Sequence, residues 1–121
     1  MNIGIIGQGF VGNAVYQKFK NYYSVYTYDL QAKLCNSTAE IINEKCKYIF
    51  VCLPTPMDKS GRCYTGIVEE VLTDLELLAS MNQEKKIVVV KSTIPPGTTD
   101  NWNKEYKWID IVFSPEFLTE A

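Results

Sequence analysis

The feature that most constrains the fold is a short apolar run joined to a glycine motif at the start of the chain. Residues 2–6 have the length of a buried strand, and residues 7–12, Gly-Gln-Gly-Phe-Val-Gly, follow at once as G-x-G-x-x-G. Apolar residues then recur at helical spacing through Phe19. A strand, a glycine turn and a helix in this order are typical of a dinucleotide site, because the N–H groups at the helix start face the pyrophosphate. The residues predicted to bind it here are Gly7, Gly9, Phe10, Val11 and Gly12.

An acidic residue follows the second predicted strand. Residues 24–28 are rich in β-branched and aromatic side chains, and Asp29 comes directly after them. This is about 20 residues beyond the glycines, where the dinucleotide fingerprint places the acid that binds the adenosine ribose. A carboxylate at that point would repel a 2′-phosphate. The pattern therefore predicts NAD as the cofactor, and not NADP.

Strands and helices alternate along the rest of the chain. Strands are predicted at residues 48–53, 87–90 and 109–113, and helices at about residues 37–46, 66–81 and 98–105. The alternation predicts an α/β fold: a Rossmann-type open, mostly parallel five-stranded sheet of order 3-2-1-4-5 flanked by helices. At 121 residues the chain fits a single NAD-binding domain, residues 1–121. The acids of the helix at 66–81 are predicted to form a solvated face; they are Glu69, Glu70, Asp74 and Glu76.

All five prolines lie just beyond the ends of three predicted strands. Hydroxyl and acidic side chains accompany them. In open α/β sheets this carboxyl edge of the strands is where ligands bind. We therefore expect the ligand at this edge, next to the glycine turn.

Composition limits the other functions open to the chain. The net charge is −2 and the basic residues are scattered, so neither a nucleic-acid surface nor an anionic-membrane surface is expected. No apolar run approaches the roughly 18 residues of a membrane span, and no signal segment opens the chain, so a cytoplasmic location is expected. The four cysteines lack C-x-x-C spacing and there is no histidine, so no metal site is expected. Proton transfer would then fall to carboxylates, lysines, hydroxyl groups or water.

Four segments resemble the UDP-glucose/GDP-mannose dehydrogenase family, whose members use NAD to oxidise UDP-glucose or related nucleotide sugars twice. The matching segments are residues 7–12, 51–56, 91–98 and 113–120. The resemblance implies that Asp29 and Lys33 hold the adenosine half of NAD. It also places further residues along the cofactor: Pro54, Thr55, Pro56, Ser92 and Thr93.

The resemblance also implies catalytic residues. Thr93 would lie near the nicotinamide and help to orient the reacting water. Glu116 and Glu120 match the two acids of the family's P-E-F-L-x-E segment, where the second acid is implicated in water activation or proton handling. Carboxylates four residues apart on a helix share a face, which suits that role.

The family continues for a further two thirds of its length, with a sugar-nucleotide domain, a nucleophilic cysteine and a catalytic lysine. None of the four cysteines here matches that nucleophile. We therefore expect a truncated enzyme, an NAD-binding domain that is inactive alone and meets UDP-glucose or a related sugar only with the missing domain. The fifth strand would be an uncovered sheet edge, through which we expect self-association into homo-oligomers.

Two alternatives remain open from the sequence. One is a stand-alone NAD-binding or regulatory module. The other is a 3-hydroxy acid dehydrogenase-like reductase domain, which shares the glycine turn but does not require the segments at 91–98 and 113–120.

Overall fold

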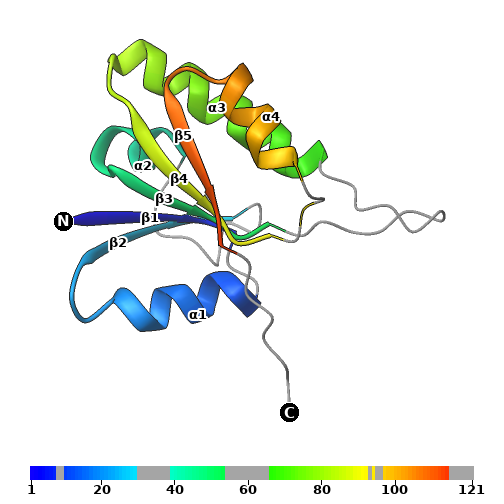
Figure 1. Cartoon of the computed structure of the whole chain (residues 1–121). Helices are drawn as coiled ribbons and strands as arrows, with labels where there is room; N and C mark the ends of the chain where they lie inside the picture. The colour runs from blue at the N-terminus through cyan, green and yellow to red at the C-terminus, as the bar shows by residue number, and fades with distance from the viewer. Residues whose placement is uncertain (8–9, 30–38, 54–65, 93, 95–96, 115–121) are drawn as a thin grey trace.

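Helices and strands alternate throughout the computed structural model, which describes residues 1–7, 10–29, 39–53, 66–92, 94 and 97–114. The elements are β1 (Asn2–Ile6), α1 (Phe10–Phe19), β2 (Ser24–Tyr28), α2 (Ala39–Lys45), β3 (Tyr48–Val51), α3 (Gly66–Asn82), β4 (Lys86–Val90), α4 (Thr98–Glu105) and β5 (Ile109–Phe113) (Figure 1). No described helix combines the length and the apolar character needed to cross a membrane.

The five strands form one parallel sheet of order β2-β1-β3-β4-β5. The predicted class of fold, an open five-stranded parallel sheet flanked by helices, is confirmed. The predicted order 3-2-1-4-5 needs a correction in one respect: β3 pairs with β1, with Ile5 opposite Phe50, and does not pair with β2.

The placement of β3 follows from how much apolar surface each strand has to bury. Ser24 of β2 is exposed and the next two residues of β2 are only partly buried, which suits an edge strand. Ile49 and Val51 of β3 are fully buried, which suits a strand in the interior of the sheet. The strand order consequently reverses between β1 and β3, and this is the switch point where ligands bind in such sheets.

The helices are divided unequally between the two faces of the sheet. Among the described helices, α1 covers one face, and α2, α3 and α4 cover the other (Figure 1). Right-handed crossovers require this division, because the chain moves one way from β1 to β2 and the opposite way from β2 through β5. The larger core cluster lies between the sheet and α2, α3 and α4, and the smaller one, which includes Ile5 and Val15, lies under α1.

Helix α3 packs through a stripe of small and aliphatic side chains. Its buried residues, Val68, Leu72, Leu75 and Ala79, recur at helical spacing and meet the sheet. One acid of this helix departs from the predicted solvated face. The carboxylate of Glu76 accepts hydrogen bonds from the backbone N–H groups of Lys107 and Trp108, each at 2.8 Å, and so holds the turn that leads into β5.

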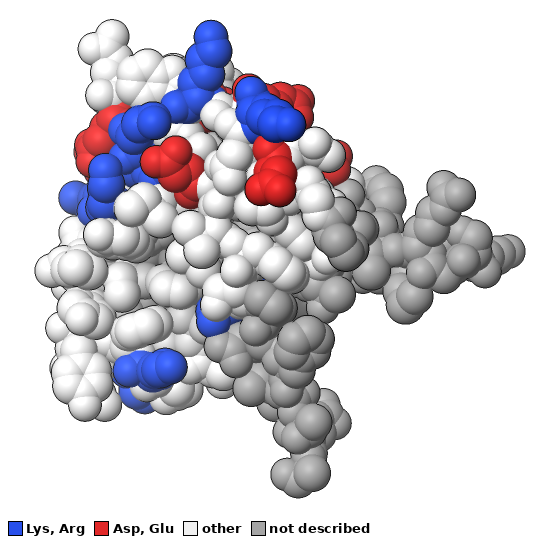
Figure 2. Space-filling model, in the orientation of Figure 1, with Lys and Arg blue, Asp and Glu red and all other residues white. Residues whose placement is uncertain are grey.

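Charged side chains of both signs are mixed toward the top of the face drawn in Figure 2, and the rest of that face is mostly uncharged. Two ion pairs are formed between described residues: Lys85 with Asp110 at 3.7 Å, and Lys86, whose side chain is buried, with Glu84 at 3.3 Å. Lys85 and Asp110 are both well exposed, so that pair contributes little to stability.

Candidate cofactor site

The carboxyl ends of β1, β2 and β3 are joined by backbone hydrogen bonds that continue the sheet past the strands. The N–H of Gly7 donates to the carbonyl oxygen of Tyr28 at 2.7 Å, and the N–H of Cys52 donates to that of Ile6 at 2.8 Å. The glycine turn, the residue after β2 and the end of β3 are therefore held together at the switch point of the sheet.

Two glycines of the motif occupy positions that no side chain could share. Gly7 has φ +97°, in the left-handed region, and a Cβ there would lie 2.6 Å from the carbonyl oxygen of Cys52. A Cβ on Gly12 would collide with the carbonyl oxygen of Gly7. Helix α1 thus begins directly against the turn, as the dinucleotide fingerprint requires.

The start of α1 has the electrostatics of an anion site. The N–H groups of Phe10, Val11 and Gly12 belong to its first turn, where a helix supplies no internal acceptors. No acidic residue lies in that turn, so no carboxylate there neutralises the positive end of the helix dipole. This end of the helix is suited to a pyrophosphate group.

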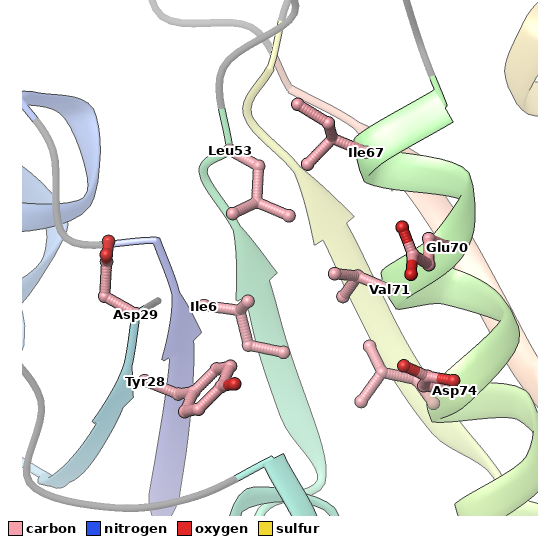
Figure 3. Close-up of a pocket in the computed structure, with 9 residues that line it drawn as sticks. Ile6, Tyr28, Asp29, Leu53, Ile67, Glu70, Val71 and Asp74 are labelled. Carbon is pink, nitrogen blue, oxygen red and sulfur yellow. The ribbon is translucent and has the colours of Figure 1, made fainter. Parts of the chain in front are cut away.

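A cavity of about 380 Å³ lies beside Asp29, between the strand ends and α3 (Figure 3). This volume is within the range of about 300–1,000 Å³ that is usual for ligand pockets. Ile6, Tyr28 and Leu53 line it from the sheet, next to Asp29. The described lining residues are mainly apolar, so the cavity suits a flat, largely apolar group attached to the ribose that Asp29 is predicted to bind.

The α3 wall of this cavity is the part of the site that the sequence interpretation missed. Ile67, Glu70, Val71 and Asp74 line the cavity from the helix. Their spacing of i, i+3, i+4 and i+7 shows that they share one helix face. The predicted order 3-2-1-4-5 places β3 away from β1, so it gives no reason to expect α3 near Asp29. In the observed order β3 lies beside β1, and α3, which follows β3 in the chain, therefore lies next to the switch point.

Ser92, predicted to bind the cofactor, lies at the end of β4 with its side chain buried. Its hydroxyl donates a hydrogen bond to the carbonyl oxygen of Leu53 at 2.6 Å. Lys91 donates through Nζ to the Ser114 hydroxyl at 3.4 Å. These two contacts connect the ends of β3, β4 and β5.

The structure brings only part of the predicted site together. Gly7, Phe10, Val11, Gly12 and Asp29 meet at the switch point. Ser92 lies at the end of β4, bonded to Leu53. The remaining predicted residues lie outside the described part of the chain: Gly9, Lys33, Pro54, Thr55, Pro56, Thr93, Glu116 and Glu120.

The two described cysteines are buried thiols. Burial raises the pKa of the Cys46 thiol to about 11, although the Lys86 ammonium acts in the opposite direction. Cys52 is 9% exposed and packs in the core under α1. Neither thiol has the exposure of a reactive cysteine. Among the described residues, no three potential metal ligands gather into a site.

Residues 24–121 match the model of the UDP-glucose/GDP-mannose dehydrogenase family, NAD binding domain. The chain belongs to this family.

Related proteins agree with the match. The UDP-glucose 6-dehydrogenase of Campylobacter jejuni is 35% identical over 75 residues, which cover 61% of this chain and 18% of that protein. A UDP-glucose dehydrogenase structure from Pyrobaculum islandicum superposes with a TM-score of 0.85 at 21% identity, over 98% of this chain and 36% of that one. The structure of a ternary complex of GDP-mannose dehydrogenase from Pseudomonas aeruginosa superposes with a TM-score of 0.84 at 22% identity, over 100% of this chain and 37% of that one.

The two structural likenesses show the fold, and the family match shows the role of the domain. This chain is an NAD binding domain of the UDP-glucose/GDP-mannose dehydrogenase family, and the predicted cofactor is confirmed as NAD. The match favours the nucleotide-sugar dehydrogenases over the 3-hydroxy acid dehydrogenase alternative. The chain spans 8–19% of the length of the curated relatives that it matches.

The contact between Gly12 and the turn leads to a test. Gly12→Ala places a methyl group against the Gly7 carbonyl, so the turn must shift, and we expect NAD affinity to fall at least about tenfold. Asn13→Ala, at the exposed neighbouring position of the same helix, serves as the matched control and should keep its affinity. Calorimetric titration with NAD measures both, and circular dichroism checks that each variant is folded. Unchanged affinity in Gly12→Ala would contradict the assignment.

Proposed function

We propose that this chain holds NAD for the oxidation of the C6 hydroxyl of a nucleotide sugar to a carboxylate. The observation that carries the proposal is the meeting of the glycine turn with Asp29 at the β1/β3 switch point, in a member of this family. The relatives named as UDP-glucose 6-dehydrogenase and GDP-mannose 6-dehydrogenase support a nucleotide sugar as the substrate class.

Each described part of the site has a defined task in this proposal. The first turn of α1 binds the pyrophosphate through its N–H groups, and Gly7 and Gly12 keep side chains out of that space. Asp29 accepts hydrogen bonds from the adenosine ribose. The cavity beside Asp29 receives the base. When bound, NAD supplies the hydride acceptor for the oxidation.

The remaining predicted roles are part of the same proposal. Thr93 orients the reacting water, and Glu116 and Glu120 activate that water or handle its proton. A chain without histidine leaves such transfers to carboxylates, lysines, hydroxyls or water, which supports the choice of these two acids. Lys33 and the segment 54–56 are proposed to contact the cofactor, as the family resemblance implies.

We also propose a cytoplasmic location and self-association. The reduced thiols of Cys46 and Cys52 are compatible with a reducing compartment.

Strand β5, through which self-association is proposed, lies at one edge of the sheet, and Val112 and Phe113 there are 50% and 39% exposed. Edge strands with exposed apolar side chains favour pairing between chains.

The choice of NAD over NADP is tested at Asp29. Repulsion of the 2′-phosphate should make NADP bind at least about tenfold more weakly than NAD, and Asp29→Ser should remove most of that preference. The control Glu69→Gln removes an acid of α3 that is not among the described lining residues. Titration of each protein with both dinucleotides measures the ratio. A preference for NAD that survives Asp29→Ser would count against the role of this carboxylate.

The chain alone is expected to bind NAD and to form no NADH from UDP-glucose. The family's two-step oxidation proceeds through a covalent intermediate on a nucleophilic cysteine, and both described thiols are buried. Incubation with NAD and UDP-glucose, followed by NADH absorbance, tests this expectation. Release of two equivalents of NADH per sugar would overturn it.

Self-association is tested by light scattering over a range of protein concentrations. We expect the apparent mass to rise with concentration, and Val112→Lys to suppress the rise because a charge blunts an edge strand. Asn101→Lys, at an exposed position of α4 away from the sheet edge, controls for added charge alone. A constant monomer mass at high concentration would rule out association through β5.

A further inference from the structure

The cavity beside Asp29 has an acidic wall that the binding of ribose does not use. Glu70 and Asp74 lie about one turn apart on α3, and both line the cavity. In Figure 3 they lie on the α3 side of the cavity, with Ile6 and Leu53 of the strand ends on the other side. The cavity therefore combines an apolar sheet wall with carboxylates on its helix wall.

Helix α3 employs its acids in two different ways. Glu76 is occupied, since its oxygens accept the N–H groups of Lys107 and Trp108. Neither Glu70 nor Asp74 forms a hydrogen bond or ion pair with another described residue. Their oxygens can therefore accept hydrogen bonds from a ligand in the cavity.

The chemistry of a carboxylate restricts which group fits against this wall. An ionised carboxylate only accepts hydrogen bonds, so the facing edge of the ligand must carry donors. The 6-amino group of adenine carries two N–H donors, one for each carboxylate. A purine with a 6-oxo group offers a single donor on this edge, N1–H, and brings its O6 acceptor against the second carboxylate, which repels it. The apolar side chains of Ile6, Leu53 and Val71 suit the flat faces of either base. Among the described lining residues, it is the carboxylates of α3 that distinguish between the two bases.

We propose that Glu70 and Asp74 recognise the 6-amino group of the adenine base and make this cavity selective for adenine dinucleotides over their 6-oxo counterparts. The inference rests on the proposed function, because it takes NAD as the ligand at this edge. It is consistent with the position of Asp29, which lines the same cavity and would hold the ribose to which the base is attached.

The exposure of the two carboxylates sets the expected size of the selectivity. Glu70 and Asp74 are both exposed, so water competes for their oxygens. A hydrogen bond to a charged group at such a site contributes toward the lower end of its usual range. We expect a preference for NAD over nicotinamide hypoxanthine dinucleotide of about tenfold, well below the preference seen where unpaired groups are fully buried.

The experiment compares the binding of these two dinucleotides to three proteins. They are the wild-type chain, the double variant Glu70→Gln/Asp74→Asn and the matched control Glu69→Gln, which removes an exposed acid at the adjacent position of α3. The amides keep the side-chain size and add N–H donors that a 6-oxo group accepts. The wild type and the control should prefer NAD about tenfold, and the double variant should lose or reverse the preference.

The outcomes separate this inference from the proposed function. A wild type that binds both dinucleotides equally would overturn the inference and leave NAD binding intact, and so would a double variant with unchanged preference. A folded wild type that binds neither would overturn the proposed function, and the inference with it. Calorimetric titration provides the affinities, and circular dichroism verifies that each protein is folded.

Discussion

The rest of the site depends on the backbone of Gly7, against which three elements pack. Its N–H donates a hydrogen bond to the carbonyl oxygen of Tyr28 at the end of β2. A side chain on Gly7 would collide with the backbone of Cys52 after β3, and a side chain on Gly12 of α1 would collide with the carbonyl oxygen of Gly7. A larger residue at either glycine would separate these elements. The approach of α1 to the sheet, and so the position of its anion-binding end, therefore depends on the absence of two β-carbons.

The same convergence explains why the cofactor site lies at the β1/β3 switch and why its walls come from distant parts of the sequence. Helix α1 leaves the sheet on one face and α3 lies on the other, so the carboxyl ends of β1 and β3 have a helix on each side. In the function proposed above, α1 offers backbone N–H groups to phosphates, and α3 offers side chains to a base. A dinucleotide is a ligand with both kinds of group.

Much of the fold could be predicted because the local patterns are strong. The glycine motif, the apolar strands and the helical period of α3 each depend on near neighbours, and the observed elements follow them closely. The placement of β3 between β1 and β4 is different, because the alternation of strands and helices along the sequence does not determine the order of strands in the sheet. The ribose-binding role of Asp29 is predicted from its distance to the glycines along the sequence. Glu70 and Asp74 are exposed, as predicted, but they also line the cavity, and Glu76 holds the turn before β5. The sequence could not show either contact, because an acid on a helix carries no sign of what lies opposite it.

The hydrogen bond from Ser92 to the Leu53 carbonyl, together with that from Lys91 to Ser114, has a thermodynamic consequence for ligand binding. These contacts tie the ends of β3, β4 and β5 to one another before any ligand arrives. Conformational freedom that is already lost in the unliganded protein is not lost again on binding, so less of the interaction energy is spent on ordering the chain. The strand ends are in this sense preorganised. The affinity of this sheet edge for a ligand therefore depends on the side chains of Ser92 and Lys91 even where they do not touch the ligand.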